Sequence, residues 1–155
     1  MRLPSFLKTG DTVAIVSPAG HVDAQQVKTA IIQLENWGLN VFVGKHTYNK
    51  HFQFAATDEQ RISDLQAVID MPEVKAIFFS RGGYGSSRII DKIDFKVLKK
   101  QPKWFIGFSD ITVFHAHLNH LYNLVTVHGP MPNNFSFEPD NDSVEVLINC
   151  LKGQD

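Results

Sequence analysis

Several features that mark whole classes of protein are scarce in this sequence. Its single cysteine, Cys150, cannot form a disulfide within the chain. Fifteen Lys and Arg residues against sixteen Asp and Glu residues leave a net charge of -1. The chain therefore lacks the excess of positive charge that is typical of proteins that bind nucleic acid or anionic membranes. The apolar runs are short, and Lys8 and Asp11 interrupt those near the amino terminus, so neither a signal peptide nor a membrane span is expected. We therefore expect a cytoplasmic protein that binds neither nucleic acid nor membranes.

What the sequence does contain is the composition of one globular domain. Of its 155 residues, 43% are hydrophobic and 20% are charged. A chain of this length can bury roughly 70% of the surface that its unfolded form exposes, so a hydrophobic core can stabilise it without disulfides. Cys150 falls in an apolar helical pattern, which predicts a reduced, buried side chain rather than a catalytic thiol.

Short apolar runs alternate with helical patterns along the chain. The runs are continuous rather than alternating, which is typical of strands buried on both faces. Helices are expected where apolar residues recur three and four positions apart, and Thr57 with Gln60 forms a capping box at the start of one of them. The predicted strands are residues 12–16, 39–43, 74–79, 104–108 and 124–127; the predicted helices are residues 23–37, 57–71, 111–121 and a last one through 144–151, with short helical pieces in 89–98.

Five buried strands that alternate with helices predict a parallel sheet covered on both faces. The fold class is therefore α/β, doubly wound and flavodoxin-like, with strand order 2-1-3-4-5. Ligands of such folds bind beyond the carboxyl ends of the strands, so three loops should meet there: residues 17–20, 81–88 and 107–112. Residues 130–142, rich in Pro, Asn and Asp, read as a long surface loop.

The strand-to-helix turn at residues 107–111 carries half of a nucleophile elbow. Ser109 follows Gly107 by two positions, as in the G-x-S-x-G pattern, but Ile111 replaces the second glycine. The elbow turn is strained, and small neighbours relieve the crowding around the serine. The alternative is that Ser109 or Asp110 only caps the following helix, which these residue types do very often. The pentapeptide alone favours the cap.

A glycine-rich segment follows the third predicted strand. Gly82, Gly83 and Gly85 can adopt positive φ and expose backbone N–H groups, as an oxyanion hole or a phosphate cradle requires. The segment matches no nucleotide-binding fingerprint, and a tight turn without function remains the alternative. Three flanking side chains could hold a substrate carboxylate: Arg81, Tyr84 and Arg88.

None of the seven histidines is an obvious partner for Ser109. His115 and His117 would lie about 9 to 12 Å along the helix from its start, too far to act as a base for the serine. His128 follows a predicted strand and is interpreted as a pocket wall or a loop brace. The other four are His21, a possible neighbour of the first loop, His120, farther along the helix, and His46 and His51, expected at the surface. No spacing among them predicts a metal site.

Four segments in order resemble the amino-terminal domain of the LD-carboxypeptidases. They are GDTVAIVSPA at residues 10–19, RGGYG at 81–85, GFSDIT at 107–112 and HGPM at 128–131. The family includes murein tetrapeptide carboxypeptidases and the microcin C immunity peptidase. Its members are cofactor-free cytoplasmic hydrolases, commonly homodimers, that remove a terminal D-amino acid such as D-Ala from an L,D bond of a peptidoglycan peptide or cleave a related amide.

The resemblance implies roles for the serine and for the amides around it. Ser109 would be the nucleophile of a Ser-Glu-His triad, and the backbone amides of Asp110, Gly83 and Gly85 would form the oxyanion hole. Beside these roles, our own prediction from the three converging loops and the strand end at His128 is that five residues contact the substrate: Ser17, Arg81, Tyr84, Arg88 and His128. The isoleucine at position 111 agrees with this family, which does not use the second elbow glycine.

The resemblance covers only the first part of such a protein. Family members are about twice as long, and their triad glutamate and histidine come from a carboxy-terminal domain to which no residue here can be matched. We therefore expect residues 1–155 to be a nucleophile-bearing domain that is inactive alone and whose partner is its own carboxy-terminal domain. Two alternatives remain: an anion-binding flavodoxin-like module in which Ser109 is a cap, and a structural or partner-binding domain.

Overall fold

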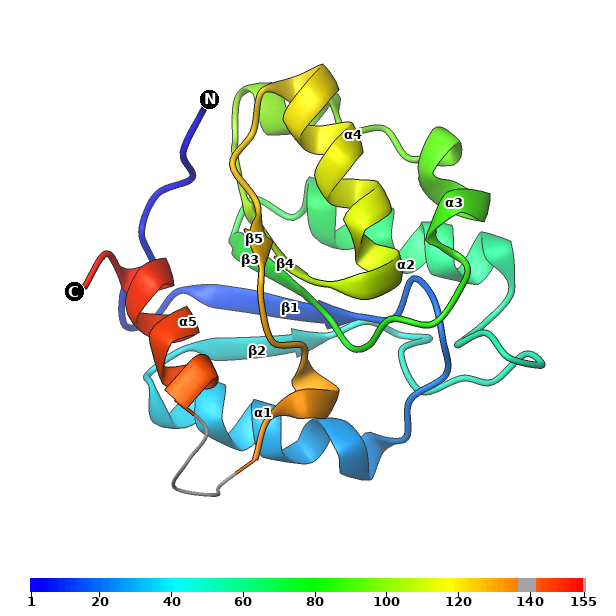
Figure 1. Cartoon of the computed structure of the whole chain (residues 1–155), viewed down its shortest axis with the longest axis horizontal. Coiled ribbons are helices and arrows are strands. Elements are labelled where there is room, and N and C mark those ends of the chain that lie inside the picture. The colour runs from blue at the N-terminus through cyan, green and yellow to red at the C-terminus, as the bar shows by residue number, and fades with distance from the viewer. Residues whose placement is uncertain (137–141, 155) are drawn as a thin grey trace.

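A computed structural model describes residues 1–136 and 142–154. Five strands form one sheet in which every neighbouring pair is parallel, in the order β2-β1-β3-β4-β5 (Figure 1). This is the predicted flavodoxin-like order, which is thereby confirmed. The strands are β1 (Thr12–Val16), β2 (Asn40–Val43), β3 (Val74–Phe79), β4 (Trp104–Gly107) and β5 (Val127–His128).

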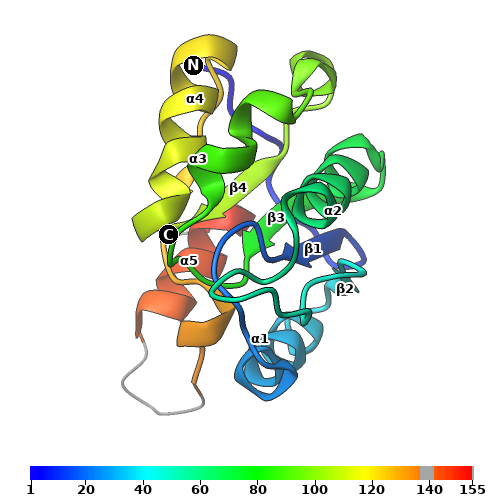
Figure 2. The same cartoon turned by 90° about the vertical axis from the view of Figure 1, so that its right-hand side faces the viewer.

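Helices cover both faces of the sheet, as Figures 1 and 2 show. On one face lie α1 (Ala24–Asn36) and α5 (Asp142–Lys152), and on the other lie α2 (Asp58–Asp70), α3 (Ser86–Ile89) and α4 (Thr112–Tyr122). Successive side chains of β1 point to opposite faces of the sheet. Val13 and Ile15 pack toward α1 and α5, whereas Ala14 and Val16 pack toward α2 and α4. The central strands β1, β3 and β4 are largely apolar because both of their faces are buried, whereas the edge strands β2 and β5 are partly exposed.

The predicted local signals are present at the helix ends. The backbone N–H of Gln60 donates to Thr57 Oγ1 at 3.3 Å, and the N–H of Thr57 donates to Gln60 Oε1 at 3.2 Å, which confirms the capping box of α2. The helical pieces predicted in residues 89–98 are the end of α3 and two 3-10 turns, at Ile90–Lys92 and Lys96–Lys99. None of the described helices combines the length and apolarity needed to cross a bilayer.

The last strand was predicted at the wrong place. β5 covers Val127–His128 rather than residues 124–127, because only Val127 and His128 pair with β4. Leu124 instead forms an isolated bridge with Arg2, whose guanidinium binds the carbonyls of Lys99 and Tyr122. Leu124, at the start of the predicted strand, is therefore bridged to the amino-terminal segment and not to β4.

Two predictions about side-chain burial were also wrong. Cys150 is exposed, because the buried face of α5 is formed by other residues, namely Val144, Leu147, Ile148 and Leu151. His46 is not a free surface residue: its Nδ1 lies 2.7 Å from Oδ1 of Asp64, and its ring is half-buried.

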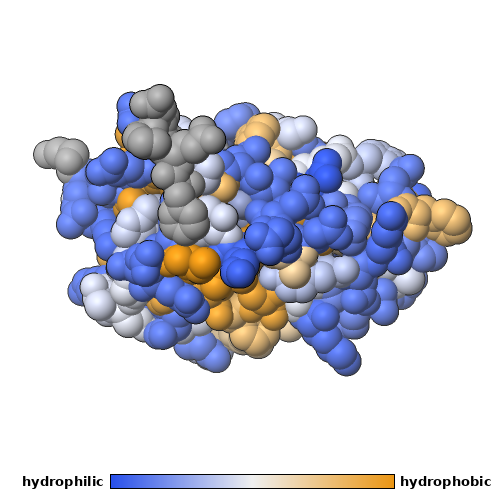
Figure 3. Space-filling model, turned by 90° about the horizontal axis from the view of Figure 1, so that it is seen from below, coloured by the Kyte–Doolittle hydropathy of each residue, from blue (hydrophilic) through white to orange (hydrophobic). Residues whose placement is uncertain are grey.

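The expected surface loop at 130–142 is partly packed. Met131, Pro132 and Phe135 are buried around a 3-10 turn, and the Phe135 ring lies 6.4 Å from those of Trp37 and Phe78. Residues 137–141 of that prediction lie outside the described residues. The face seen in Figure 3 is largely hydrophilic; its largest apolar area lies just below the centre of the view, with smaller ones toward the edges.

Candidate functional site

The loops that follow β1, β3 and β4 meet at the carboxyl edge of the sheet. The backbone N–H of Gly20, after β1, donates to the carbonyl of Gly82, after β3, at 3.1 Å. A Cβ atom added to Gly82 would lie 3.1 Å from Cβ of Ser109, which follows β4. The three segments that the sequence singles out are therefore in direct contact.

Ser109 has the backbone conformation of an elbow rather than of a helix cap. Its φ is +61°, and only two other non-glycine residues in the described chain, Phe52 and Asn123, have positive φ. A serine N-cap has extended φ and ψ and accepts a hydrogen bond from the helix, but neither the 3-10 turn Ser109–Ile111 nor α4 receives a side-chain cap bond in the described structure. The Ser109 side chain is exposed at the edge of the sheet.

Ile111 explains how this elbow forms without its second glycine. A Cβ atom on Gly107 would lie 2.8 Å from Cγ2 of Ile111, so the isoleucine occupies the space that the missing Gly107 side chain leaves. Ile111 is fully buried in the core between the sheet and α4. The crowding is therefore relieved at Gly107, and the surface beside Ser109 stays open.

The glycine-rich loop lies against Ser109. A Cβ atom on Gly82 would be 3.3 Å from Ser109 Oγ and 3.6 Å from the backbone nitrogen of Asp110, so only glycine fits without displacing the serine. Gly83 and Gly85 have φ of +115° and +139°. Within residues 1–136 and 142–154, no acceptor pairs with the N–H group of either glycine. These donors remain available to a bound group.

Asp110 adds a side-chain contact that the sequence did not reveal. Its Oδ2 accepts a hydrogen bond of 2.9 Å from the backbone N–H of Ser86. The carboxylate of the residue after Ser109 therefore ties the elbow to the far end of the glycine-rich loop.

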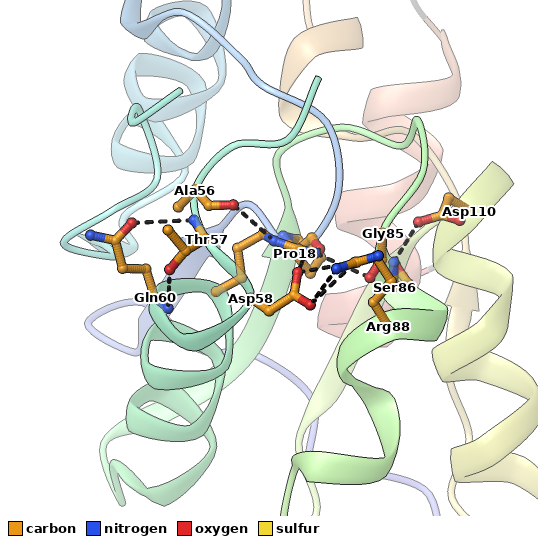
Figure 4. A network of polar contacts seen from close by, with 10 residues as sticks. Pro18, Ala56, Thr57, Asp58, Gln60, Gly85, Ser86, Arg88 and Asp110 are labelled. Carbon is orange, nitrogen blue, oxygen red and sulfur yellow. Dashed lines mark hydrogen bonds and ion pairs between the residues drawn. The ribbon is translucent and has the colours of Figure 1, made fainter. Parts of the chain in front are cut away.

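Arg61 of α2 is the main site residue that sequence reasoning missed. It is only 2% exposed, and its guanidinium donates to the carbonyls of Pro18, Ala56 and Gly85, the last at 3.1 Å. Figure 4 labels these three acceptor residues around it. It also pairs with Asp58. Burial is the main reason that the pKa of Arg61 lies below its usual value, and the charge of Asp58 opposes this shift.

Asp58 bridges two arginines. Arg88 Nη2 lies 2.8 Å from Asp58 Oδ2, and Arg61 binds the other carboxylate oxygen. The hydrogen bond from Arg88 is the largest cause that lowers the pKa of Asp58. Both guanidinium groups also lie over the Phe54 ring, with centroid distances of 4.9 Å for Arg61 and 5.4 Å for Arg88. Arg88 is therefore engaged within the chain rather than free.

Arg81 and Tyr84 border an open pocket beside the loop. The pocket has a volume of about 510 Å³ and is also lined by Gly20, Gly83 and Lys50. Nη1 of Arg81 donates to the carbonyl of His21 at 3.1 Å, while its buried Nε has no partner among the described residues. Tyr84 is 51% exposed. This pocket offers cationic and aromatic groups beside Gly83.

The remaining two predicted substrate contacts differ in their surroundings. Ser17 is buried; its hydroxyl donates to the carbonyl of Thr47 at 2.9 Å and lies 2.5 Å from Ser80 Oγ. His128 is exposed at the end of β5, with its ring 6.0 Å from that of Phe108. The structure thus places His128 at the edge of the site and Ser17 beneath it.

His115 lies behind the elbow. Its Nε2 is 2.8 Å from the carbonyl oxygen of Gly107, and burial lowers its pKa. Its buried Nδ1 has no partner in the part of the chain that the structure describes. His115 therefore braces the end of β4, two residues before Ser109. Across residues 1–136 and 142–154, no three His, Cys, Asp or Glu side chains gather as a metal site would require.

Comparison with known proteins identifies the class of this domain and then its family. A family model described as the LD-carboxypeptidase N-terminal domain matches residues 13–129, which places the chain among the peptidases. The chain belongs to the LD-carboxypeptidase family. It is 42% identical over 83% of its length to a probable murein peptide carboxypeptidase of Bacillus subtilis and 33% identical over 82% to the murein tetrapeptide carboxypeptidase of Pseudomonas aeruginosa.

The solved structures agree with this assignment. An MccF-like protein of Bacillus anthracis superposes with a TM-score of 0.89 over 97% of the chain, at 29% identity. The chain spans 40% and 41% of the lengths of the two curated relatives and 47% of the B. anthracis chain. The similarity therefore covers less than half of each of these proteins.

Proposed function

We propose that this chain is the nucleophile-bearing amino-terminal part of a serine-type LD-carboxypeptidase. The enzyme hydrolyses the L,D-amide bond at the carboxyl end of a murein tetrapeptide or a related peptide and releases D-Ala. The observation that carries the proposal is the exposed Ser109 at φ +61° with Gly82 packed against it. A non-glycine residue in this conformation costs about 1 to 3 kcal/mol, and such strain is concentrated at functional sites.

The reaction would proceed through an acyl-enzyme. Ser109 Oγ attacks the scissile carbonyl and gives its proton to a general base, and the oxygen of the tetrahedral intermediate accepts hydrogen bonds from the amides of Asp110, Gly83 and Gly85. The intermediate collapses as the C–N bond breaks, and the base returns the proton to the leaving amine of D-Ala. Water then attacks the ester carbonyl and gives a proton to the base. The C–O bond to Ser109 breaks, the base passes that proton to Ser109 Oγ, and the shortened peptide leaves with a new carboxylate.

The general base is expected from outside this chain. In the described residues no group forms a hydrogen bond with Ser109 Oγ, and Nε2 of His115 is bound to the carbonyl of Gly107. We propose a Glu-His pair in a carboxy-terminal domain, since the relatives are more than twice as long as the matched segment. Residues 1–155 alone would then retain only the weak activity that an oxyanion hole and substrate binding provide.

The residues proposed to contact the substrate differ in whether their polar groups already have partners within the chain. Arg81, Tyr84 and His128 present atoms to solvent or to the pocket and would contact the peptide directly, with Arg81 binding a carboxylate. Ser17 and Arg88 are already bonded to Thr47 and Asp58, so they would touch substrate only by exchanging these partners. The proposal further includes a cytoplasmic, cofactor-free enzyme that acts as a homodimer.

The test is release of D-Ala from a murein tetrapeptide by the full-length protein. Ser109→Ala should abolish release, because the acyl-enzyme cannot form. Ser63→Ala, which changes an exposed serine of α2 outside the site, is the matched control and should leave the rate unchanged. If the Ser109→Ala enzyme releases D-Ala at the wild-type rate, Ser109 is not the nucleophile.

A further inference from the structure

One peptide bond of the glycine-rich loop lies between two oppositely charged side chains. The carbonyl of Gly85 accepts a hydrogen bond of 3.1 Å from Arg61 Nη1, and the N–H of Ser86, on the same peptide, donates to Asp110 Oδ2 at 2.9 Å (Figure 4). The cation is on the oxygen side and the carboxylate on the N–H side, so both charges favour the same orientation of the peptide dipole. Hydrogen bonds to ionised groups are about twice as strong as those between neutral groups.

Arg61 is itself held firmly. It lies within α2, its side chain is buried, and Asp58 and the carbonyls of Pro18 and Ala56 accept further hydrogen bonds from its guanidinium. A buried guanidinium needs such partners, because an unpaired buried charge is very costly. Since Pro18 belongs to the loop after β1, Arg61 fixes that loop and the glycine-rich loop to one rigid helix.

The absence of a side chain at Gly85 permits the contact with Arg61. A Cβ atom there would lie 2.7 Å from Arg61 Nη1, and its φ of +139° is unfavourable for other residues. The guanidinium therefore approaches the loop backbone more closely than any side chain at position 85 would permit.

Asp110 links the same peptide to the elbow. It directly follows Ser109, so the bond from its carboxylate to Ser86 fixes how far the glycine-rich loop lies from the serine. Because Ser86 uses its N–H in this bond, that group is not free to stabilise an oxyanion. The donors that remain free in this part of the loop include those of Gly83 and Gly85.

We propose that Arg61 and the carboxylate of Asp110 are positioning residues, which clamp the Gly85–Ser86 peptide and thereby aim the loop amides at the carbonyl attacked by Ser109. This inference rests on the proposed function, since it assigns a purpose to the loop only if Ser109 is the nucleophile. Neither side chain touches the reacting atoms; each acts through the peptide that it holds.

Loss of either side of the clamp should affect the chemical step more than substrate binding. Misplacement of a catalytic group by about 1 Å can cost about 100-fold in rate. We expect Arg61→Met and Asp110→Ala each to lower kcat about 10- to 100-fold with little change in KM. Asp110→Asn should recover part of the loss, because its amide oxygen can still accept from Ser86.

The experiment measures kcat and KM for D-Ala release by these variants and by the double variant in the full-length protein. Because both side chains act on one peptide, the double variant should lose little more than the worse single one. Amide hydrogen exchange at Ser86 should become faster in Asp110→Ala. Lys103→Met is the matched control: it removes another buried cation that donates to backbone carbonyls, those of Val68 and Met71, and should keep the wild-type kcat.

The outcomes separate this inference from the proposed function. Wild-type kcat in folded Asp110→Ala, or single losses that multiply in the double variant, would overturn the clamp even if Ser109→Ala is inactive. The Asp110 variants decide the matter if Arg61→Met fails to fold, because Asp110 is only half-buried. Full activity of Ser109→Ala would instead refute the proposed nucleophile.

Discussion

Gly82, in the loop after β3, packs directly against Ser109, in the loop after β4. A Cβ atom on Gly82 would lie 3.1 Å from the Cβ and 3.3 Å from the Oγ of Ser109. Contacts this short are tighter than nine in ten of those that real Cβ atoms make. The position of the serine hydroxyl therefore depends on the absence of a side chain at residue 82, which gives a direct test.

Gly82→Ala should lower kcat about tenfold or more, because the serine must move by a few tenths of an ångström. Its effect on stability should be small, since the displaced side chain is exposed. Steady-state D-Ala release and thermal unfolding measure the two effects. Gly129→Ala, where the added Cβ would meet side-chain methyls of Val127 and Leu147, is the comparison and should keep kcat. Equal kcat in both variants would contradict the contact.

Gly107 and Ile111 should be energetically coupled. Gly107→Ala should destabilise the domain by about 1 to 3 kcal/mol, because the new Cβ would lie 2.8 Å from Ile111 Cγ2. Adding Ile111→Ala should cost less in this background than in the wild type, since it removes the clashing atoms. Urea unfolding of the two single variants and the double variant gives the coupling free energy. Strict additivity of the two losses would show that the elbow accommodates residue 107 in another way.

Part of the loss of folding stability at acidic pH should come from His115. Burial lowers the pKa of this histidine in the folded state, so below pH about 6.5 the unfolded chain binds its proton more readily. The contribution of His115 to stability is therefore present above that pH and is lost as the pH falls through the folded-state pKa. Urea unfolding at pH 7.5 and pH 5 should show a smaller pH dependence in His115→Phe. An unchanged dependence would mean that other groups cause the acid sensitivity.

Lys103 should change the free energy of unfolding at alkaline pH. Burial lowers its pKa from 10.5 to about 8, so between these values the unfolded chain binds more protons than the folded one. The free energy of unfolding of the wild type, relative to Lys103→Met, should therefore rise as the pH increases from about 8 to 10.5. Denaturant midpoints of both proteins across this range measure the difference. A difference that stays constant or falls would contradict the buried charge.

The fold was predictable largely because the three central strands are buried on both faces. β1, β3 and β4 therefore read as continuous apolar runs, and the connecting helices carry clear caps such as Thr57. β5 was misplaced because only two of its residues pair with β4, while Leu124, at the start of the predicted strand, bridges Arg2 at the far end of the sequence. Pairing between distant segments leaves no periodic signal in the sequence.

The site was predictable in its location but not in its geometry. The pentapeptide around Ser109 favoured a helix cap, because residue type alone does not reveal the positive φ that the packing of Gly107 against Ile111 permits. Arg61 was missed because a helical arginine is normally exposed. Its position four residues before Leu65 and seven before Val68 does place it on the buried stripe of α2, which was the available signal.

The most direct test of the nucleophile is to trap the acyl-enzyme. The full-length protein is mixed with a murein tetrapeptide, quenched in acid within the first turnover, digested and mapped by mass spectrometry. The account requires the acyl group, equal to the substrate minus D-Ala, on the peptide that contains Ser109, and its absence from Ser109→Ala. An acyl group on another residue, or D-Ala release by Ser109→Ala at the wild-type rate, would contradict it.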